Sequence, residues 1–407
     1  MRLPGILRIK DFDYTLPPER IAQYPLEKRD ASKLLVWENG KISERVFSDI
    51  ASVLPPHSTL FLNDTKVIHA RLIFSKSTGA TIEIFCLEPL EPTAEIEAAF
   101  TQPSGCIWKC LIGNVKRWKD GILEKTFIQE GRSFYLTAMK KGNLGDGFFS
   151  VEFRWEPSAL SFSSVIEQAG LVPLPPYITR ASVPADNERY QTIYAKHEGS
   201  VAAPTAGLHF TKGILDHLKK KNIGFEHLTL HVGIGTFRPV SVDDIASHIM
   251  HPEKICVGIS VIRDLIREDK RKVISVGTTS VRTLESLYWL GVKIITEGTV
   301  HSPVVNQWDA YDPALDKNIP ARDALTALAG FLKKNEMEFF CGSTSLMIVP
   351  GYRFRIINGM ITNFHMPQST LLLLVAAFAG ENWKSAYEYA LQHDFRFLSY
   401  GDACLFF

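Results

Sequence analysis

Short stretches of alternating apolar and polar residues recur between about residue 70 and residue 155, and turns containing glycine separate them. The stretches are Ala80 to Cys86, Ile107 to Ile112, Ile122 to Ile128, Ser133 to Ala138 and Phe148 to Phe153. An alternation with a period of two residues indicates β-strands that have one buried face. Strands this short and this closely spaced are typical of a small antiparallel barrel or sandwich. We therefore expect residues 63–161 to form an inserted β-barrel domain.

The residues on either side of this segment alternate between strand-like and helical patterns. Residues 272–276 form an apolar strand pattern, residues 281–291 place apolar side chains on one helical face, and residues 292–296 again resemble a strand. Gly291 is expected to end the helix. A chain of 407 residues exceeds the size at which a single core stops growing. We therefore predict an α/β fold, in which residues 1–62 and 162–407 form one discontinuous domain around the inserted barrel.

The cysteines and the apolar runs indicate the compartment. The six cysteines form no CxxC pair, so we expect reduced thiols in a cytoplasmic protein. Cys106 and Cys110 have a metal-like separation, but Gly113 stands where a third ligand would belong, and no metal site is expected. The start of the chain is interrupted by Pro4 and does not resemble a signal peptide. The longest apolar run, Leu371 to Ala379, predicts a buried helix and is far shorter than the roughly 20 residues that cross a bilayer.

Polar loops follow several of the expected strands. Residues 202–211, AAPTAGLHFT, combine small residues that a ligand can approach closely with the hydroxyl of Thr205 and the imidazole of His209. This pattern favours a pocket wall, and the alternative is a buried turn with a core histidine. Residues 230–240, LHVGIGTFRPV, form a second such stretch, in which His231 precedes two open glycines and a threonine.

Two further loops begin helices. Residues 277–280, GTTS, place hydroxyls and free N–H groups at a helix N-terminus after a strand, which is a ready site for an anion or a ribose, or else an N-cap. Arg282 and Glu285 lie off the apolar face of that helix. Asn363 and His365 precede the apolar helix, whose positive end then points toward something polar.

Charge gives a weaker signal. The 45 Lys and Arg residues nearly balance the 44 Asp and Glu residues, which neither requires nor excludes a nucleic-acid partner. A basic cluster interleaved with tryptophan is either a phosphate-contacting face or a solvated strand edge; it comprises Lys109, Lys116, Arg117 and Lys119, with Trp108 and Trp118. The polar groups at 29–30 and 63–66 either reach a ligand or satisfy their own turns.

Known fingerprints for nucleotide, metal or serine-nucleophile chemistry do not occur: the chain has no P-loop, no HExxH, no nucleophile elbow and no dinucleotide motif. The residue types suit a polar small molecule and acid–base work by histidine or carboxylate. The residues alone therefore indicate an α/β enzyme with an inserted β domain.

Eight stretches, in order along the chain, resemble the S-adenosylmethionine:tRNA ribosyltransferase-isomerases of queuosine biosynthesis. They are DFDYTLPPERIAQYPLEKRDASKLLV, LFLNDTKVIHARL, PLPPYI, ERYQTIYAKHEGSVAAPTAGLHFT, HVGIGTFRPV, VGTTSVRTLE, NFHMPQSTLLLLVAAFAG and SYGDA. The resemblance implies an α/β domain with a small inserted β-barrel. It also implies transfer and isomerisation of the ribosyl group of S-adenosylmethionine onto 7-aminomethyl-7-deazaguanine at the tRNA wobble position. Epoxyqueuosine-tRNA, adenine and methionine are then the products, and no prosthetic group is needed.

This reaction suggests roles for the residues in the matching stretches. Because the sulfonium acidifies the 5′ carbon, a base has to remove that proton, and the acid–base candidates are His209, His231, Glu285 and Asp402. The expected S-adenosylmethionine contacts are Thr205, Ala206, Gly207, Phe210, Gly233, Gly235, Thr236, Gly277, Thr278, Thr279, Arg282, Asn363 and His365. The expected tRNA contacts are Arg29, Asp30, Asn63, Asp64, Lys66, Arg71, Lys116 and Arg117.

Two other functions remain as alternatives. An S-adenosylmethionine-dependent methyltransferase would use the same co-substrate, although the glycine-rich loop of most such enzymes is missing. A tRNA-binding paralogue without catalysis would have no need for an internal pocket. The chain departs from the family pattern at Lys66, where arginine is common, and in a long connector at 298–345. We expect the protein to act as a monomer, with no membrane partner.

Overall fold

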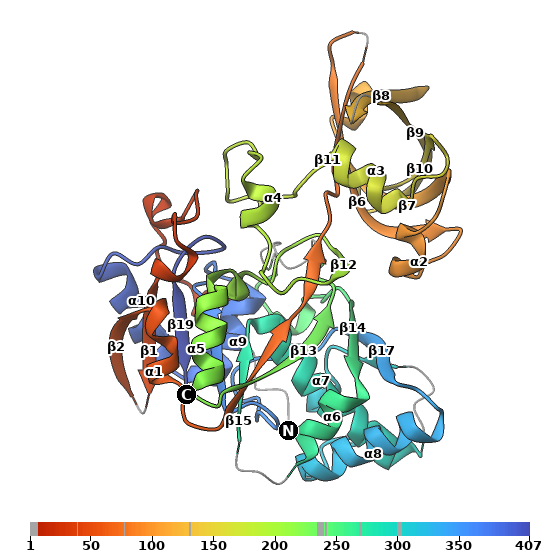
Figure 1. Cartoon of the computed structure of the whole chain (residues 1–407). Coiled ribbons are helices and arrows are strands. Elements are labelled where there is room, and N and C mark those ends of the chain that lie inside the picture. Colours follow the sequence, from red (N-terminus) through yellow and green to blue (C-terminus); the bar gives the residue numbers. More distant parts are fainter. Residues whose placement is uncertain are drawn as a thin grey trace.

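The computed structural model describes residues 7–38, 40–76, 78–129, 132–233, 240, 242–267, 271–298 and 303–407. A mixed sheet of ten strands forms the centre of its larger part (Figure 1). In spatial order the strands are β16 (Val304–Val305), β17 (Phe339–Thr344), β14 (Glu253–Gly258), β13 (Gly224–Leu230), β3 (Ser58–Asn63), β15 (Lys272–Val276), β18 (Gly359–Asn363), β19 (Ala403–Phe406), β1 (Lys33–Glu38) and β2 (Lys41–Val46).

Four neighbouring strands in the middle of this sheet run parallel. β13 pairs with β3, β3 with β15, and β15 with β18, each in the parallel sense. Their carboxyl ends therefore lie at the same edge of the sheet. β19 runs antiparallel to β18, and β1 runs parallel to β19, so these two strands begin at that edge. The edge thus collects the residues that follow four strands and precede two others.

Helices cover both faces of the ten-stranded sheet. Leu60 and Leu62 of β3 pack in one core cluster with α1 (Ile50–Val53) and α5 (Lys212–Lys220), whereas Phe61 lies in the opposite cluster. The helices of that opposite cluster are α6 (Ile259–Ile266), α7 (Thr278–Glu297), α8 (Ala321–Lys334), α9 (Thr370–Ala379) and α10 (Asn382–Gln392). The α/β prediction is confirmed for this part, and the apolar run forms the largely buried helix α9 as expected.

The β-α-β prediction for residues 272–296 is wrong in its second half. Residues 292–296 are not a strand, because α7 continues through Gly291 to Glu297 and ends at Gly298, which has φ +76°. A Cβ on Gly291 would collide with the carbonyl oxygen of Ala324 in α8. The glycine therefore permits close packing of two helices and does not end one of them.

A second, antiparallel sheet of seven strands curls around its own core, at the upper right of Figure 1. In order its strands are β11 (Gly170–Leu171), β5 (Arg71–Ser75), β6 (Thr81–Glu91), β7 (Gly105–Gly113), β10 (Phe148–Glu156), β9 (Arg132–Gly145) and β8 (Ile122–Gln129). α2 (Ile96–Phe100) and α3 (Phe162–Ala169) contribute to the same core. All the strands expected between residues 80 and 153 belong to this sheet.

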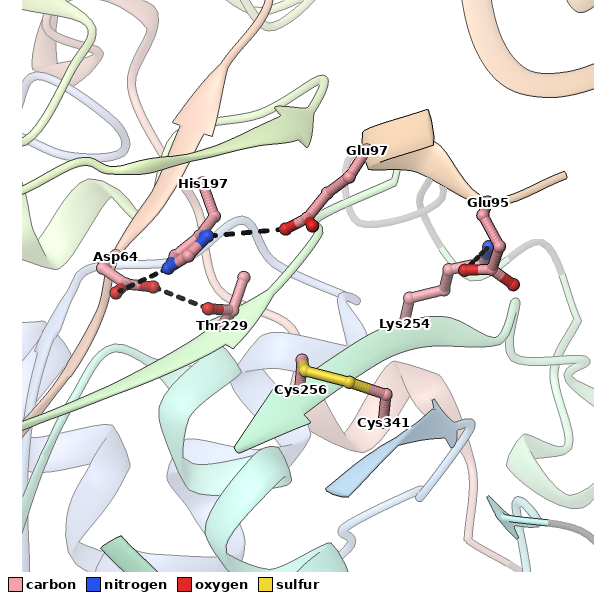
Figure 2. Close-up of a disulfide and its surroundings, with 8 residues drawn as sticks. All are labelled: Asp64, Glu95, Glu97, His197, Thr229, Lys254, Cys256 and Cys341. Carbon is pink, nitrogen blue, oxygen red and sulfur yellow. Dashed lines mark hydrogen bonds and ion pairs between the residues drawn. A yellow bond between two sulfur atoms is a disulfide. The ribbon is translucent and has the colours of Figure 1, made fainter. Parts of the chain in front are cut away.

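Two short elements link the sheets. β4 (Thr65–Val67) pairs in parallel with β12 (His197–Ser200), while α4 (Asp186–Arg189) lies on the segment that leads to β12. Polar contacts join the parts at this place: His197 Nδ1 lies 3.5 Å from Glu97 Oε1 of α2, and its Nε2 lies 3.8 Å from Asp64 Oδ2 (Figure 2). Lys254 Nζ of β14 donates to the carbonyl oxygen of Ala94 at 2.8 Å. The curled sheet is thereby held against the carboxyl edge of the ten-stranded sheet.

The expectation that every cysteine is a reduced thiol is wrong. Cys256 of β14 and Cys341 of β17 form a disulfide (Figure 2). The two residues are 85 positions apart, but they stand directly opposite each other in the antiparallel register of these strands. That register brings the two side chains together, and no spacing rule in the sequence could reveal it. Free and buried cysteines occupy positions 86, 106, 110 and 404.

The part of the chain that the structure describes shows neither a metal-binding cluster nor a membrane-spanning helix. The described residues contain no group of three or more His, Cys, Asp or Glu side chains placed to hold a metal ion. In the same residues, no helix combines the length and the apolar character that crossing a membrane demands.

Substituting Gly291 tests the close contact between α7 and α8. The added methyl group of Gly291→Ala meets the backbone of α8, so we expect the free energy of unfolding to fall by about 1–3 kcal/mol. Gly330→Ala is the matched control, because Gly330 lies on an exposed face of α8 with open space around it, and should raise that free energy by about 0.5–1 kcal/mol. Urea unfolding measures both. A Gly291→Ala variant as stable as the wild type would contradict the packing described here.

Candidate active site

The carboxyl edge of the ten-stranded sheet brings the expected polar loops together. Asn63, the last residue of β3, donates from Nδ2 to the carbonyl oxygen of Leu230 at 3.0 Å and accepts the Leu230 N–H at 3.1 Å. Thr205, in the short helix η6 (Thr205–His209), donates its hydroxyl to Oδ1 of Asn363 at the end of β18, at 3.0 Å. The loops that follow β3, β13, β15 and β18 thus meet one another and the 202–211 segment.

A cavity of about 330 Å³, the smaller of the two described here, lies between these loops. Residues 202–206 and 277–279 line one part of its wall, and residues 362–366 line another. Tyr177 and Ser399, joined by a hydrogen bond of 2.7 Å between their hydroxyls, complete its polar surface. Its volume and its mixture of apolar walls with a few polar groups suit a small organic ligand.

The N-terminus of α7 faces this cavity. Gly277 precedes the helix with φ +89°, a conformation that residues with a side chain rarely adopt, and it makes no side-chain cap. Ser280 donates its hydroxyl back to the Val276 carbonyl, so it serves the helix itself. Thr278 and Thr279 line the cavity. The positive end of a 20-residue helix is therefore available to an anionic group of a ligand.

The stretch AAPTAGLHFT divides between cavity and core. Ala202 to Ala206 line the smaller cavity, but Gly207 and Phe210 do not. A Cβ on Gly207 would collide with the hydroxyl of Tyr194, and Phe210 packs against Phe47 with ring centroids 5.1 Å apart. The last two residues therefore pack the protein interior and are not placed to touch a ligand.

His209 is also buried behind the cavity wall. Asn363 donates from Nδ2 to His209 Nε2 at 3.2 Å, which leaves the His209 Nδ1–H to donate to the Ser32 hydroxyl at 2.8 Å. Burial, and secondarily the charge of Arg396, lowers its pKa to about 3, so the ring is neutral. Both nitrogens are engaged. His209 thus fixes the orientation of Asn363, which in turn holds Thr205.

His365 lines the smaller cavity itself. Its Nε2 lies 2.8 Å from the Thr362 hydroxyl, and burial lowers its pKa to about 3. Its backbone N–H donates to the Tyr387 hydroxyl at 3.1 Å. The ring is a neutral wall group at physiological pH.

A larger cavity of about 740 Å³ lies beside the smaller one and shares Val232 and Leu371 with it. The curled sheet contributes Glu88, Pro89, Lys109 and Phe148 to its wall. The opposite wall contains His231 and Gly233, which follow β13, Glu253 of β14 and Arg282 of α7. The segment 247–252, in which Ile249 is 78% exposed, forms its rim. The two sheets together therefore enclose a space large enough for a ligand bigger than that of the smaller cavity.

His231 lines the larger cavity and differs from the other buried histidines. The Thr65 hydroxyl donates to the His197 carbonyl at 3.4 Å, so it accepts a hydrogen bond from His231 Nδ1–H at 3.0 Å. Among the described residues, none forms a hydrogen bond with its Nε2. Burial, and then the charge of His197, lowers its pKa to about 4. His231 is therefore neutral, with the Nε2 lone pair available as a proton acceptor.

The two carboxylates expected to act as acid or base accept hydrogen bonds from backbone N–H groups of the protein itself. Glu285 of α7 accepts hydrogen bonds from the Tyr352 hydroxyl and from the N–H groups of residues 355–357, at 2.9–3.2 Å. Asp402 accepts from the N–H groups of Lys33 and Arg396 at 2.9 and 2.7 Å. Burial raises the pKa of both. Neither lines a cavity described here, so each stabilises a loop at some distance from the ligand space.

Most residues expected to contact tRNA have partners within the protein. Arg29 donates to the carbonyls of Glu188 and Gln191, both at 2.7 Å. The other internal contacts join Asp30 to Thr211, Asp64 to Thr229, Lys66 to Glu198 and Arg71 to Glu83. Lys116 and Arg117 are exposed in the curled-sheet part. Trp108 and Trp118 are buried in its core, so these two tryptophans do not lie on an exposed basic face.

Two expected contacts, Gly235 and Thr236, lie outside the described residues. Other cavity residues were missed, above all Glu253 and the 247–252 rim. Glu253 alternates with Ile255 and Val257 on the buried face of β14, and a carboxylate at such a position is a signal that the sequence contains. The rim has no comparable signal.

Comparison with known proteins gives a consistent result. A family model described as "Queuosine biosynthesis protein" matches residues 9–406. The S-adenosylmethionine:tRNA ribosyltransferase-isomerase of Thermotoga maritima is 40% identical over 404 residues, covering 98% of this chain and 99% of the relative. The enzyme of that name from Aromatoleum aromaticum is 38% identical over 403 residues, covering 98% and 96%.

One solved structure is also similar. The crystal structure of S-adenosylmethionine tRNA ribosyltransferase from Thermotoga maritima aligns with a TM-score of 0.46 and 31% identity, covering 98% of this chain and all of that one.

The buried neutral state of His209 predicts a pH-dependent stability. Because its pKa is about 3 in the folded state and near 6.5 when unfolded, the unfolded chain binds more protons below pH 6.5. Stability therefore falls as the pH drops from 6.5 toward 4, and His209→Gln should reduce that slope by about 1.4 kcal/mol per pH unit. Urea unfolding at several pH values measures it. His217→Gln, at an exposed position of α5, is the control and should keep the wild-type slope; an unchanged slope in His209→Gln would contradict the assignment.

Proposed function

This chain belongs to the family of queuosine biosynthesis proteins. On that premise we propose that its two cavities form the active site of an S-adenosylmethionine:tRNA ribosyltransferase-isomerase. The enzyme joins the ribosyl group of S-adenosylmethionine to 7-aminomethyl-7-deazaguanine at the tRNA wobble position. Epoxyqueuosine-tRNA forms, and adenine and methionine leave. One observation carries the assignment to this site: a small cavity and a large cavity share a wall at Val232 and Leu371, as a transfer between a small molecule and a tRNA base requires.

S-adenosylmethionine is assigned to the smaller cavity. The N-terminus of α7 suits the carboxylate of its methionine part, because backbone N–H groups and the helix dipole both favour an anion there. The hydroxyls of Thr205 and Ser399 and the amide of Asn363 suit the ribose and the adenine edge. The small side chains of Ala202 and Ala203 leave space for the rings.

The tRNA base is assigned to the larger cavity. An enzyme that modifies a base has to take it out of the stack into a pocket, and this cavity opens between the two sheets. We assign β5 to β10 of the curled sheet to the inserted barrel domain, residues 63–161, and residues 1–62 and 162–407 to the discontinuous α/β domain. From the second of these segments, α3 and β11 complete the curled sheet and its core. Lys109 in the cavity wall and the exposed Lys116 and Arg117 supply positive charge for the RNA backbone.

His231 is the proposed general base. The sulfonium acidifies the 5′ carbon of the ribosyl group, and the neutral Nε2 of His231 accepts that proton close to the shared wall. Adenine leaves with proton assistance as the sugar ring opens, the aminomethyl nitrogen then attacks the opened sugar, and methionine departs as the epoxide closes. His209 acts through Asn363, whose amide it orients, and is a positioning residue.

The setting of the reaction follows from its substrates. We propose that the enzyme acts on its tRNA as a monomer. Because the substrate is tRNA, we assign the enzyme to the cytoplasm.

Filling the smaller cavity tests the co-substrate assignment. The side chain of Ala203→Leu would extend into this cavity, so we expect the KM for S-adenosylmethionine to rise at least about 10-fold with little change in the KM for tRNA. Steady-state kinetics with each substrate varied in turn measures both constants. Leu371→Ala removes part of the wall that the cavities share, so we expect it to change the KM for both substrates. An unchanged KM for S-adenosylmethionine in Ala203→Leu would exclude the smaller cavity as its site.

A product assay tests the reaction and the base together. The enzyme is incubated with S-adenosylmethionine and tRNA carrying 7-aminomethyl-7-deazaguanine, and adenine and methionine should form in equal amounts. His231→Gln should lower kcat by about 10²–10⁴-fold and remove the acidic limb of the pH profile. His217→Gln is the exposed control. Formation of S-adenosylhomocysteine would indicate a methyltransferase, and tRNA binding without turnover would indicate a non-catalytic binder.

A further inference from the structure

A buried ion pair forms part of the larger cavity and has no role in the assignments above. Arg282 of α7 and Glu253 of β14 form an ion pair, and each side chain is only 5% exposed. The N–H of Gly233 also donates to Glu253 Oε1, at 3.4 Å. Burial lowers the pKa of Arg282 to about 10, so the guanidinium keeps its charge at physiological pH. Both residues line the larger cavity, and Arg282 lies one helical turn along α7 from the threonines of the smaller one.

Such a pair is a poor means of stabilising a fold. Removing two charges from water costs several kcal/mol per ion, and an apolar pair of the same size often serves stability as well. Elsewhere around this cavity the wall offers apolar groups such as Val232, Leu346 and Leu374. A carboxylate and a guanidinium side by side therefore give this wall a specific pattern of acceptors and donors.

That pattern is complementary to a guanine edge. Guanine presents the N1–H and 2-amino donors beside the O6 acceptor, and a carboxylate can accept from both donors. A guanidinium donates to O6, the group that arginine commonly reads in guanine. A 7-deaza base retains this edge. Its aminomethyl group is attached to the five-membered ring, away from N1 and the 2-amino group, and so remains free to react.

Building on the proposed function, we infer that Glu253 and Arg282 select the tRNA base: Glu253 accepts hydrogen bonds from N1–H and the 2-amino group, and Arg282 donates to O6. Both residues then determine specificity in the larger cavity. Arg282, expected from the sequence to contact S-adenosylmethionine, contacts the other substrate instead.

The test compares two RNA hairpins in the anticodon context. One carries 7-aminomethyl-7-deazaguanine, and the other carries the same base without its 2-amino group. For the wild type, kcat/KM and equilibrium binding should both fall by about 5–150-fold for the second hairpin. Glu253→Gln should reduce this discrimination to about 3-fold or less. The amide NH₂ group that replaces one carboxylate oxygen is a donor, so it cannot accept a hydrogen bond from N1–H or the 2-amino group of the base. Glu253→Asp keeps the charge but shifts the oxygens, and should give an intermediate value.

Asp309→Asn is the matched control. It removes the carboxylate of another largely buried ion pair, in which Asp309 Oδ2 lies 2.5 Å from Nζ of Lys293 on α7. We expect it to lower stability, as Glu253→Gln does, while it keeps the wild-type discrimination. Thermal unfolding shows which variants are folded. The comparison of the two hairpins with the wild-type enzyme does not depend on any variant.

The outcomes separate this inference from the proposed function. Equal binding and turnover of both hairpins by the wild type, or equal discrimination by the wild type and Glu253→Gln, would overturn the inference while leaving the reaction intact. A Glu253→Gln variant that changes only the KM for S-adenosylmethionine would likewise overturn it. Absence of turnover with either hairpin would reject the proposed function, and the binding ratio would still decide whether Glu253 reads the 2-amino group.

Discussion

The parallel alignment of β13, β3, β15 and β18 is the constraint on which the site depends. Parallel strands end at one edge, so loops that are far apart in the chain deliver their polar groups to one place. The buried amide of Asn63 joins β3 to β13 at that edge and satisfies both backbone groups of Leu230. Without this arrangement, the alanines at 202–206, the helix N-terminus at 277 and the amide of Asn363 would have no common cavity.

Hydrogen bonds give different roles to the buried histidines of this protein. His209, His231 and His365 are all neutral because desolvation lowers the pKa of each ring. His209 uses both nitrogens to hold its neighbours, whereas His231, which lines the larger cavity, has a hydrogen bond among the described residues through Nδ1 alone. Hydrogen-bond partners, rather than residue type or charge, therefore distinguish a positioning histidine from a proton acceptor in this protein.

Much of the fold could be predicted from the sequence because it depends on local periodicity. The alternating stretches from Ala80 to Phe153 form strands, and the apolar run at 371–379 forms a buried helix. The failures concern contacts between distant segments. Gly291 reflects the approach of α8, and the disulfide depends on the register of β14 and β17. The burial of Trp108 depends on which face of its strand is covered.

The candidate site was predictable to a similar extent. The sequence identifies the loops because small and polar residues at strand ends are locally visible. It does not reveal which side chain of a loop turns inward, so His209 and Phe210 were grouped with Thr205 although only Thr205 lines the smaller cavity. Glu285 and Asp402 illustrate the same limit, since each carboxylate satisfies backbone N–H groups of a loop that is distant in sequence.

The wall shared by the two cavities has a thermodynamic consequence. Val232 and Leu371 belong to both linings, so a ligand that displaces either side chain in one cavity changes the shape of the other. Any such effect is a coupling free energy between the two substrates, and it is reciprocal: each substrate alters the affinity for the other by the same factor. Two apolar side chains are thus enough to couple the affinity for one substrate to the binding of the other.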